Sequence, residues 1–267
     1  TSDTYKPTQE LSSKSQTGSA TIIIGGLGFL VWENIVQKRS FGKFSVYARM
    51  VLLMTAALLA VGWAGTCLLE WNNPETLGGM TVGEKLLNGF FQSATLRTAG
   101  FAAIDQAKLT ESGKAFSCVL MSIGGSSGST AGGIKTVTFL VLALTIWARA
   151  RGKSTVCAFK RTIPDEQTQN AMIIAFIVLA LAVFGGIFIS ATSPMSFTDA
   201  VYEAVSALAT VGLSAGGTAS LSIPAQILII IYMYFGRVGV LTISLGFLAG
   251  DRAEERFRYA ETNLLIG

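Results

Sequence analysis

Histidine is absent from this sequence of 267 residues. The chain therefore lacks the usual general base and the commonest metal ligand of proteins, and it cannot form a Ser-His or Cys-His nucleophilic pair. The three cysteines, Cys67, Cys118 and Cys157, are scattered and outline neither a disulfide framework nor a metal cluster. We therefore expect no enzyme, no catalytic residues and no cofactor in this chain.

Charge is also scarce. Charged residues make up 13% of the sequence, whereas soluble proteins carry about 25%. Three long stretches, residues 50–69, 167–198 and 204–236, contain no charged residue at all. Segments of this length can cross a hydrocarbon core about 30 Å thick. These observations exclude a water-soluble protein and predict an all-α, multi-pass membrane protein embedded in a lipid bilayer.

The few positive charges are unevenly placed. They gather in two loops, at Lys38, Arg39, Lys43 and Arg49, and at Arg149, Arg151, Lys153, Lys160 and Arg161. The positive-inside rule puts these loops in the cytoplasm, and the segments after Leu69 and Ser190 are balanced or acidic. The net charge of +4 is too small to suggest a nucleic-acid partner.

The apolar segments follow a repeated order. Their ranges are 21–36, 50–69, 82–96, 113–148 (interrupted at 124–133), 171–190, 197–209 and 224–250. Residues 82–96 and 197–209 are too short to cross, and each is followed by a glycine-bearing loop. One constant offset aligns Thr98, Ala99, Gly100 and Phe101 with Thr210, Val211, Gly212 and Leu213, and it also aligns Gly125 with Arg237. The order predicts two units of span, short helix, loop and span.

Two half-length helices ending inside a membrane predict pore loops. Irregular backbone at that depth is tolerated only where protein or a water-filled cavity surrounds it. The carboxyl end of each helix directs the negative end of its dipole at the pore, and glycine lets loop carbonyls point inward. Rings of such carbonyls replace the hydration shell of a potassium ion. The pattern is therefore typical of a cation path.

Other interpretations of the same residues remain open at this point. A carrier with broken helices and alternating access would place its substrate in the break at 124–133. An intramembrane serine hydrolase could use Ser126, which lies in a G-x-S-x-G pattern, with Lys135 as its base. Arg237 lies in an apolar segment, so it should face a pore or a polar partner. We expect Arg97 to bond the carbonyls of the neighbouring 98–101 loop.

Several motifs together resemble the Ktr/Trk/HKT superfamily of potassium transporters, most closely the bacterial Ktr membrane subunit. They are Ile24–Phe29, Leu68–Asn72, Arg97–Phe101, Gly124–Lys135, Ala209–Ser214 and Gly236–Gly239. In that family four span–pore-loop–span units of one chain surround one pore. The resemblance implies that residues 21–39 are the inner span of a second unit, 40–152 a third unit, and 153–267 a fourth unit with a tail. Residues 1–20 are a polar segment of uncertain placement.

The resemblance also assigns roles to residues. The ion filter would comprise Thr98, Ala99, Gly100, Phe101, Thr210, Val211, Gly212 and Leu213. The intramembrane gate would comprise Gly124, Gly125, Ser126, Ser127, Gly128, Ser129, Thr130, Ala131, Gly132, Gly133, Lys135 and Arg237. The implied protein takes up K⁺ in the bacterial plasma membrane, with Na⁺ as a second ion. It would form a homodimer, with its C-terminal end near the dimer interface, on a cytoplasmic ring of nucleotide-binding RCK subunits.

Overall fold

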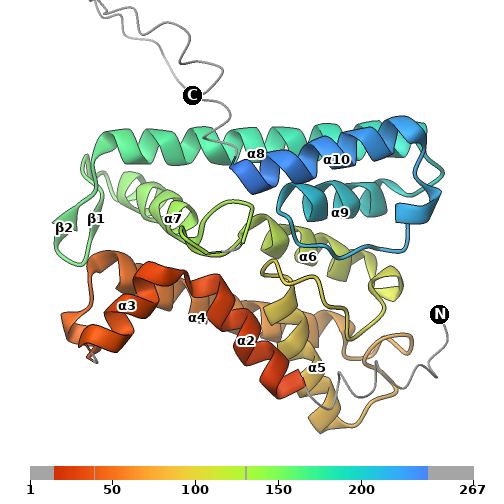
Figure 1. Cartoon of the computed structure of the whole chain (residues 1–267), viewed down its shortest axis with the longest axis horizontal. Helices are drawn as coiled ribbons and strands as arrows, with labels where there is room; N and C mark the ends of the chain where they lie inside the picture. Colours follow the sequence, from red (N-terminus) through yellow and green to blue (C-terminus); the bar gives the residue numbers. More distant parts are fainter. Residues whose placement is uncertain (1–14, 39, 130, 240–267) are drawn as a thin grey trace, which may run out of the picture.

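The computed structural model describes residues 15–38, 40–129 and 131–239, and this part of the chain is mostly helical (Figure 1). The helices are α2 (Ser15–Leu27), α3 (Phe29–Lys38), α4 (Val46–Glu70), α5 (Val82–Thr95), α6 (Glu111–Ser122), α7 (Thr136–Ala150), α8 (Asp165–Thr192), α9 (Phe197–Leu208) and α10 (Ile223–Val238). Single 3-10 turns occupy Phe41–Lys43, Gln106–Lys108 and Thr218–Ser220. An antiparallel hairpin pairs β1 (Cys157–Ala158) with β2 (Arg161–Thr162).

Two of the described helices, α4 and α8, are long and apolar enough to cross a membrane by length and composition. Helices α7 and α10 are apolar but shorter. Large apolar side chains stay exposed along α8 and α10, among them Phe176, Leu179, Ile187, Ile227 and Ile230. Exposed apolar surface of this extent does not suit water, so these faces fit lipid.

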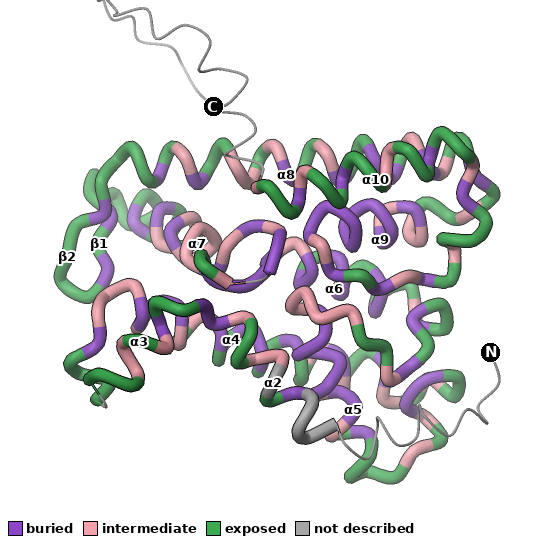
Figure 2. The backbone as a smooth tube through the Cα atoms, viewed as in Figure 1, coloured by how far each residue is buried: buried purple, intermediate pink, exposed green. Residues whose placement is uncertain are grey.

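The element order of α4 and α5 recurs in α8 and α9. In each case a long helix is followed by a short one packed against it, and then by an irregular segment. Helix α9 also packs against α6 and α10, which places it inside the molecule (Figure 1). Figure 2 shows buried residues along α9 and exposed ones along the outer side of α8. Helix α9 therefore lies in the interior, and α8 covers it.

The predicted span 21–36 is not one helix. It divides into α2 and α3 at Gly28, whose φ is +77°. A Cβ atom at this position would lie 2.8 Å from Ser126 Oγ and 2.9 Å from Ser127 O. Only glycine combines this backbone angle with such a close approach. The segment therefore breaks where it meets the 124–133 loop, and its role as a span stays a prediction.

Two predicted boundaries also differ. Helix α2 begins at Ser15, so the polar segment 1–20 includes its first turns. The predicted span 224–250 is helical only to Val238 in the described part, where Gly239 (φ +97°) ends the helix. The remainder of that span and the C-terminal end, expected near a dimer interface, lie outside the described residues.

The largest buried cluster lies between α4, α6 and α9. It includes Leu58, Leu96, Met121, Tyr202 and Val211, and both Leu96 and Tyr202 are completely buried. This cluster joins the first unit to the second, because its members come from 58–123 and from 182–215. The core therefore fixes the segments that follow the two short helices against each other.

Candidate functional site

The segments 98–101 and 210–213 each follow the carboxyl end of a short helix. Helix α5 begins at a Thr81–Glu84 cap, in which the Thr81 amide and hydroxyl donate to Glu84 Oε2 at 2.9 and 2.8 Å. Helix α9 begins at Ser196, whose Oγ accepts from the Asp199 amide at 3.1 Å. With their amino ends capped, both helices direct the negative ends of their dipoles at the two segments.

Both segments have the same unusual backbone. The φ angle is positive at Thr98 (+66°) and Gly100 (+76°), and again at Thr210 (+54°) and Gly212 (+89°). Threonine rarely adopts this region, so two such residues at matching places store conformational strain. Strain of this kind persists only where the surrounding fold imposes it.

In each of the two segments, one carbonyl group accepts a hydrogen bond from a described residue and the other three do not. The fourth carbonyl of each accepts a hydroxyl from the preceding helix, from Thr95 to Phe101 O at 2.7 Å and from Ser206 to Leu213 O at 2.5 Å. Within the described residues, the carbonyls of 98–100 and 210–212 accept no hydrogen bond. Of these six residues only Val211 is buried and Gly212 is exposed, so the free oxygens are open to water or to a cation.

The two segments lie directly against each other. A Cβ atom built on Gly100 would lie 2.4 Å from Val211 O and 3.4 Å from Gly212 Cα. No side chain fits in that space. The fold thus brings together the two loops that the sequence aligned, and their unpaired carbonyls share one small region.

The buried carboxylate of Glu203 holds the residues that follow the second segment. Glu203 of α9 is 5% exposed, and its oxygens accept from Ser214 Oγ (2.5 Å), the Ala215 amide (3.0 Å) and Thr218 Oγ1 (3.0 Å). The sequence analysis did not single out Glu203. The signal that could have identified it is a glutamate within an otherwise apolar short helix.

A second polar network joins the two short helices. Gln92 Nε2 and Tyr202 OH both donate to Gln106 Oε1, at 2.6 and 2.9 Å, and all three side chains are buried. Lys114 of α6 also forms an ion pair with Asp199 of α9 at 2.7 Å. The sequence analysis missed these residues because the contacts link positions about 90 residues apart.

The 124–133 loop closes on itself between α6 and α7. Its base is a parallel bridge between Ile123 and Ile134, in which the Gly124 amide donates to Ile134 O at 2.9 Å. The loop also packs against both carbonyl segments. A Cβ atom at Gly132 would lie 2.3 Å from Thr210 Oγ1, and one at Gly124 would lie 3.6 Å from Thr98 Cγ2. The predicted gate residues therefore adjoin the first residue of each predicted filter segment.

The same loop is tied to the break between α2 and α3. The Ser126 amide donates to Gly26 O at 3.0 Å, and Ser126 Oγ donates to the carbonyls of both Gly26 and Leu27. Tyr47 OH donates to Ser127 O at 2.9 Å. The break frees carbonyls that the loop then satisfies. The sequence alone did not pair these two glycine-rich segments.

The two gate cations lie near the loop. Lys135 Nζ donates to the Ala131 carbonyl. Arg237 lies in the last turn of α10 and its side chain is exposed. Thr130, the remaining gate residue, lies outside the described residues.

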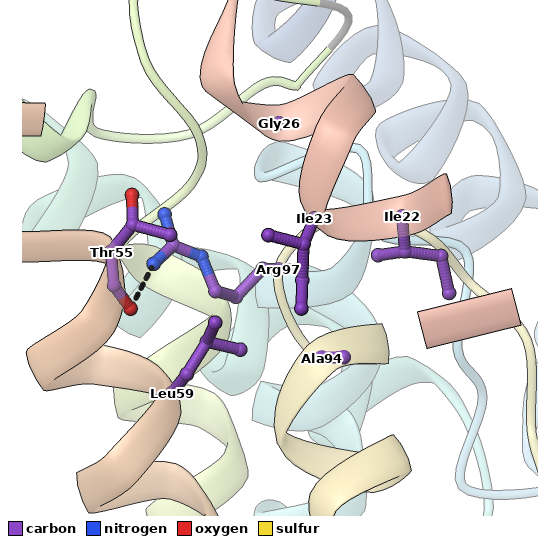
Figure 3. A pocket seen from close by; sticks show the side chains of 7 residues that line it. All are labelled: Ile22, Ile23, Gly26, Thr55, Leu59, Ala94 and Arg97. Atoms are coloured by element: carbon purple, nitrogen blue, oxygen red, sulfur yellow. Dashed lines mark hydrogen bonds between the residues drawn. The ribbon is translucent and has the colours of Figure 1, made fainter. Parts of the chain in front are cut away.

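Arg97 points away from the 98–101 segment that it was expected to bond. Its guanidinium donates to Gly124 O at 3.1 Å. It also donates to Thr55 O of α4 at 3.4 Å (Figure 3). It lines a small cavity with Thr55, Leu59 and Gly26, and the buried Thr55 hydroxyl has no partner among the described residues. The expectation is corrected: Arg97 connects the outer helix α4 to the 124–133 loop, because the carboxyl end of α5 directs it there.

The serine-hydrolase interpretation does not fit this geometry. Ser126 is fully buried and donates to backbone carbonyls, while Lys135 bonds a different carbonyl and not Ser126. Within the described ranges, no three His, Cys, Asp or Glu side chains form a metal-binding group. The polar groups of the break bond to one another, which also weakens the case for a carrier with its substrate in that break.

Residues 15–255 match the TrkH family model, described as a cation transport protein. The chain is 37% identical to the potassium/sodium uptake protein NtpJ of Enterococcus hirae, over 93% of this chain and 56% of that protein. It is 34% identical to the Ktr system potassium uptake protein B of Bacillus subtilis, over 88% of this chain and 53% of that protein.

Among solved structures, the potassium transporter TrkH of Vibrio parahaemolyticus has the same fold. The TM-score is 0.68 at 18% identity, over 90% of this chain and 52% of that one. This chain thus spans about half the length of the relatives it matches. These relatives are named as transport proteins and not as enzymes.

Proposed function

This chain belongs to the TrkH family of cation transport proteins, and from that premise we propose that it is the pore-forming part of a potassium uptake system. Its ion filter would be built from residues 98–101 and 210–213. The ion would be K⁺, with Na⁺ as a second candidate because one relative is named as a potassium/sodium uptake protein. The transported ion is cargo, and the proposal requires no chemical step.

The unpaired carbonyls carry this proposal. Residues 98–100 and 210–212 present backbone oxygens that no described donor satisfies, at the negative ends of two helix dipoles. A partly dehydrated cation would satisfy them, since it needs oxygen ligands in place of its lost water. Anions would be repelled by the same groups. The two aligned loops would provide two sides of a filter, and the other sides would come from equivalent loops.

We propose the 124–133 loop as the gate of this path. It lies against Thr98 and Thr210, so an ion leaving the filter on that side would meet it. The loop is held by hydrogen bonds to the α2–α3 break and to Arg97, and such bonds can exchange without unfolding a helix. Lys135, which donates to the loop carbonyl of Ala131, and Arg237 would add positive charge to this gate.

Cation flux through the full-length gene product, reconstituted in liposomes, tests the filter. Gly100→Ala and Gly212→Ala should each reduce potassium flux at least tenfold or remove the preference for K⁺ over Na⁺, because a methyl group would strain the positive-φ backbone. Gly83→Ala is the matched control, since nothing lies within 4 Å of its added Cβ. Wild-type flux and selectivity in both filter variants would refute the filter assignment.

The gate needs a separate measurement. Arg237→Ala should raise flux through the closed state, because it removes a positive charge beside the ion path. Arg237→Lys keeps that charge and should retain most of the closure. If neither variant changes flux or its regulation, Arg237 has no gating role.

We further propose the assembly that the family resemblance implies. The chain would form a homodimer and bind a cytoplasmic ring of nucleotide-binding RCK subunits through its basic end. Mass determination of the purified protein in detergent tests the dimer. Co-purification with the candidate ring, with and without nucleotide, tests the ring. A monomer that binds no ring in either condition would remove this part of the proposal.

A further inference from the structure

An apolar groove of about 360 Å³ lies at the basic end of the molecule. Its walls include Leu53 and Ala57 of α4, Leu140 and Leu144 of α7, and Cys157 and Phe159 of the hairpin. The volume is within the range of small-ligand sites, and its lining is suited to a hydrocarbon chain rather than to a polar solute. Because α4 is a candidate membrane span, the groove adjoins the layer where lipid lies.

The hairpin that closes this groove has a strained turn. Phe159 (φ +48°) and Lys160 (φ +63°) both adopt the left-handed region, which non-glycine residues rarely enter. Both side chains are exposed. A hairpin with a two-residue loop favours the type I′ turn, in which both loop residues have positive φ, so the hairpin itself accounts for these angles. Here the turn presents one aromatic ring and one cation beside an apolar groove.

Arg49 lies at the edge of the groove. The Arg49 guanidinium lies 5.7 Å from the centre of the Phe159 ring. Its Nε and Nη2 donate to the carbonyls of Phe44 and Gly42, at 3.0 and 2.8 Å, which fix its position. Arg161 of β2 is exposed next to Lys160. In the described ranges none of these three cations has a carboxylate within ion-pair distance.

We propose that this groove binds an anionic phospholipid. One acyl chain would lie in the groove, and the phosphate would sit among Arg49, Lys160 and Arg161. Phosphate is the complement of such a cluster, and basic pockets between membrane helices on the cytoplasmic side recognise anionic headgroups. The site is distinct from the proposed filter and gate, and it would couple the lipid composition of the membrane to the hairpin between α7 and α8.

Cys157 is a native reporter of occupancy. Its thiol is exposed and lines the groove, whereas Cys118 is buried. The full-length protein is placed in nanodiscs of pure phosphatidylcholine or of phosphatidylcholine mixed with phosphatidylglycerol. Modification of Cys157 by a membrane-impermeant maleimide is then followed by mass spectrometry of its peptide. We expect modification to slow several-fold in the anionic membrane, because bound lipid covers the thiol.

Variants that remove one positive charge distinguish specific lipid binding in the groove from general attraction of anionic lipid to the charged surface. Lys160→Gln or Arg161→Gln should each weaken protection about fivefold, the equivalent of about 1 kcal/mol for one basic side chain near an anionic surface. Lys108→Gln, an exposed lysine far along the chain, is the charge control and should leave protection unchanged. Ala57→Phe should fill the groove and abolish the lipid dependence without changing any charge.

Three results would overturn the proposal. Equal modification of the wild type in both membranes would mean that no anionic lipid binds there. Loss of protection in Lys108→Gln would assign the effect to bulk electrostatics. Protection that appears in pure phosphatidylcholine only after a purified cytoplasmic partner is added would make the groove a protein contact. None of these measurements depends on ion flux, so the site can fail while the proposed filter stands.

Discussion

The carbonyl segments and the 124–133 loop are both irregular backbone between helices, yet they satisfy their polar groups in opposite ways. Residues 98–100 and 210–212 leave their carbonyls without donors among the described residues, and buried side chains such as Glu203 and Thr95 hold the surrounding backbone. The loop instead bonds its own groups to neighbouring helices, through Ser126, Arg97 and Tyr47.

This difference indicates different tasks. A rigid segment with unpaired oxygens can bind an ion, because its ligands are already in place. The ion then binds without the loss of entropy that ordering the ligands would require. A segment whose bonds are all made to neighbours can change partners at low cost, since each hydrogen bond contributes only about 1 kcal/mol net. The following variants are designed to break or sharpen this comparison, from the largest expected effect to the smallest.

Removing the buried carboxylate should have the largest effect. Glu203→Ala removes the acceptor of three hydrogen bonds, of which the one from the Ala215 amide is buried, and should lower the free energy of unfolding by about 3 kcal/mol. Glu203→Gln keeps an oxygen for Ser214 and Ala215 and should lose much less. Thermal unfolding in detergent measures the stability of each variant. Competition between K⁺ and Na⁺ measures its ion selectivity. Equal behaviour of both variants would show that the acceptor oxygen is not what supports residues 214–218.

Removing Arg97 should affect the loop more than the filter. Arg97→Ala deletes donors to Gly124 O and Thr55 O and should destabilise the fold by about 2 kcal/mol. We expect higher flux in the closed state with nearly unchanged ion preference. Arg97→Lys, with one point charge in place of a planar fork, should restore part of the closure. A changed ion preference with normal closure would place Arg97 with the filter instead.

Ser126→Ala tests the bond between the loop and the α2–α3 break. The variant loses the hydroxyl donor to Gly26 and Leu27, a loss of about 1 kcal/mol, or roughly fivefold in the closed-to-open equilibrium. Flux measured under closing conditions should rise accordingly. Ser129→Ala is the internal control, since Ser129 Oγ donates only within the loop, to Ser126 O. A larger effect in Ser129→Ala would contradict the proposed role of the break.

Acid should affect the cap of α5 slightly. The Thr81 amide, and then its hydroxyl, lower the pKa of Glu84 by donating to the carboxylate. A lowered folded pKa means that this stabilisation is present above the ordinary glutamate pKa and is lost as the pH falls through the lowered value. Glu84→Gln should reduce that part of the acid dependence in thermal unfolding. If Glu84→Gln unfolds with the same pH dependence as the wild type, the cap does not contribute to the pH dependence of stability.

The sequence predicted several elements well, and the reason is local. Charge-free runs identified α4 and α8, and five glycines in ten residues identified the break between α6 and α7. The offset that aligned Gly100 with Gly212 predicted two loops that the structure brings into contact. Their role as a filter stays a prediction, as do the gate residues and the division into repeat units.

The errors have a common cause. The break of the segment 21–36 at Gly28 was not predicted, because nothing local shows that Gly28 must pass beside Ser126. Arg97 was expected to bond the loop next to it in sequence, but helix direction sends it to Gly124. In both cases the deciding contact joins residues many positions apart, and periodicity carries no information on such contacts.

By itself, the sequence determined that the chain is a helical membrane protein with two short helices ending in glycine-bearing loops. Apolar length, charge placement and glycine act within one segment, so they can be recognised without a partner. Only the tertiary structure decided which carbonyls lack donors, that Glu203 supports residues 214–218, and that the 124–133 loop closes on the α2–α3 break. Those features depend on hydrogen bonds between distant segments, which exist only after the helices have packed.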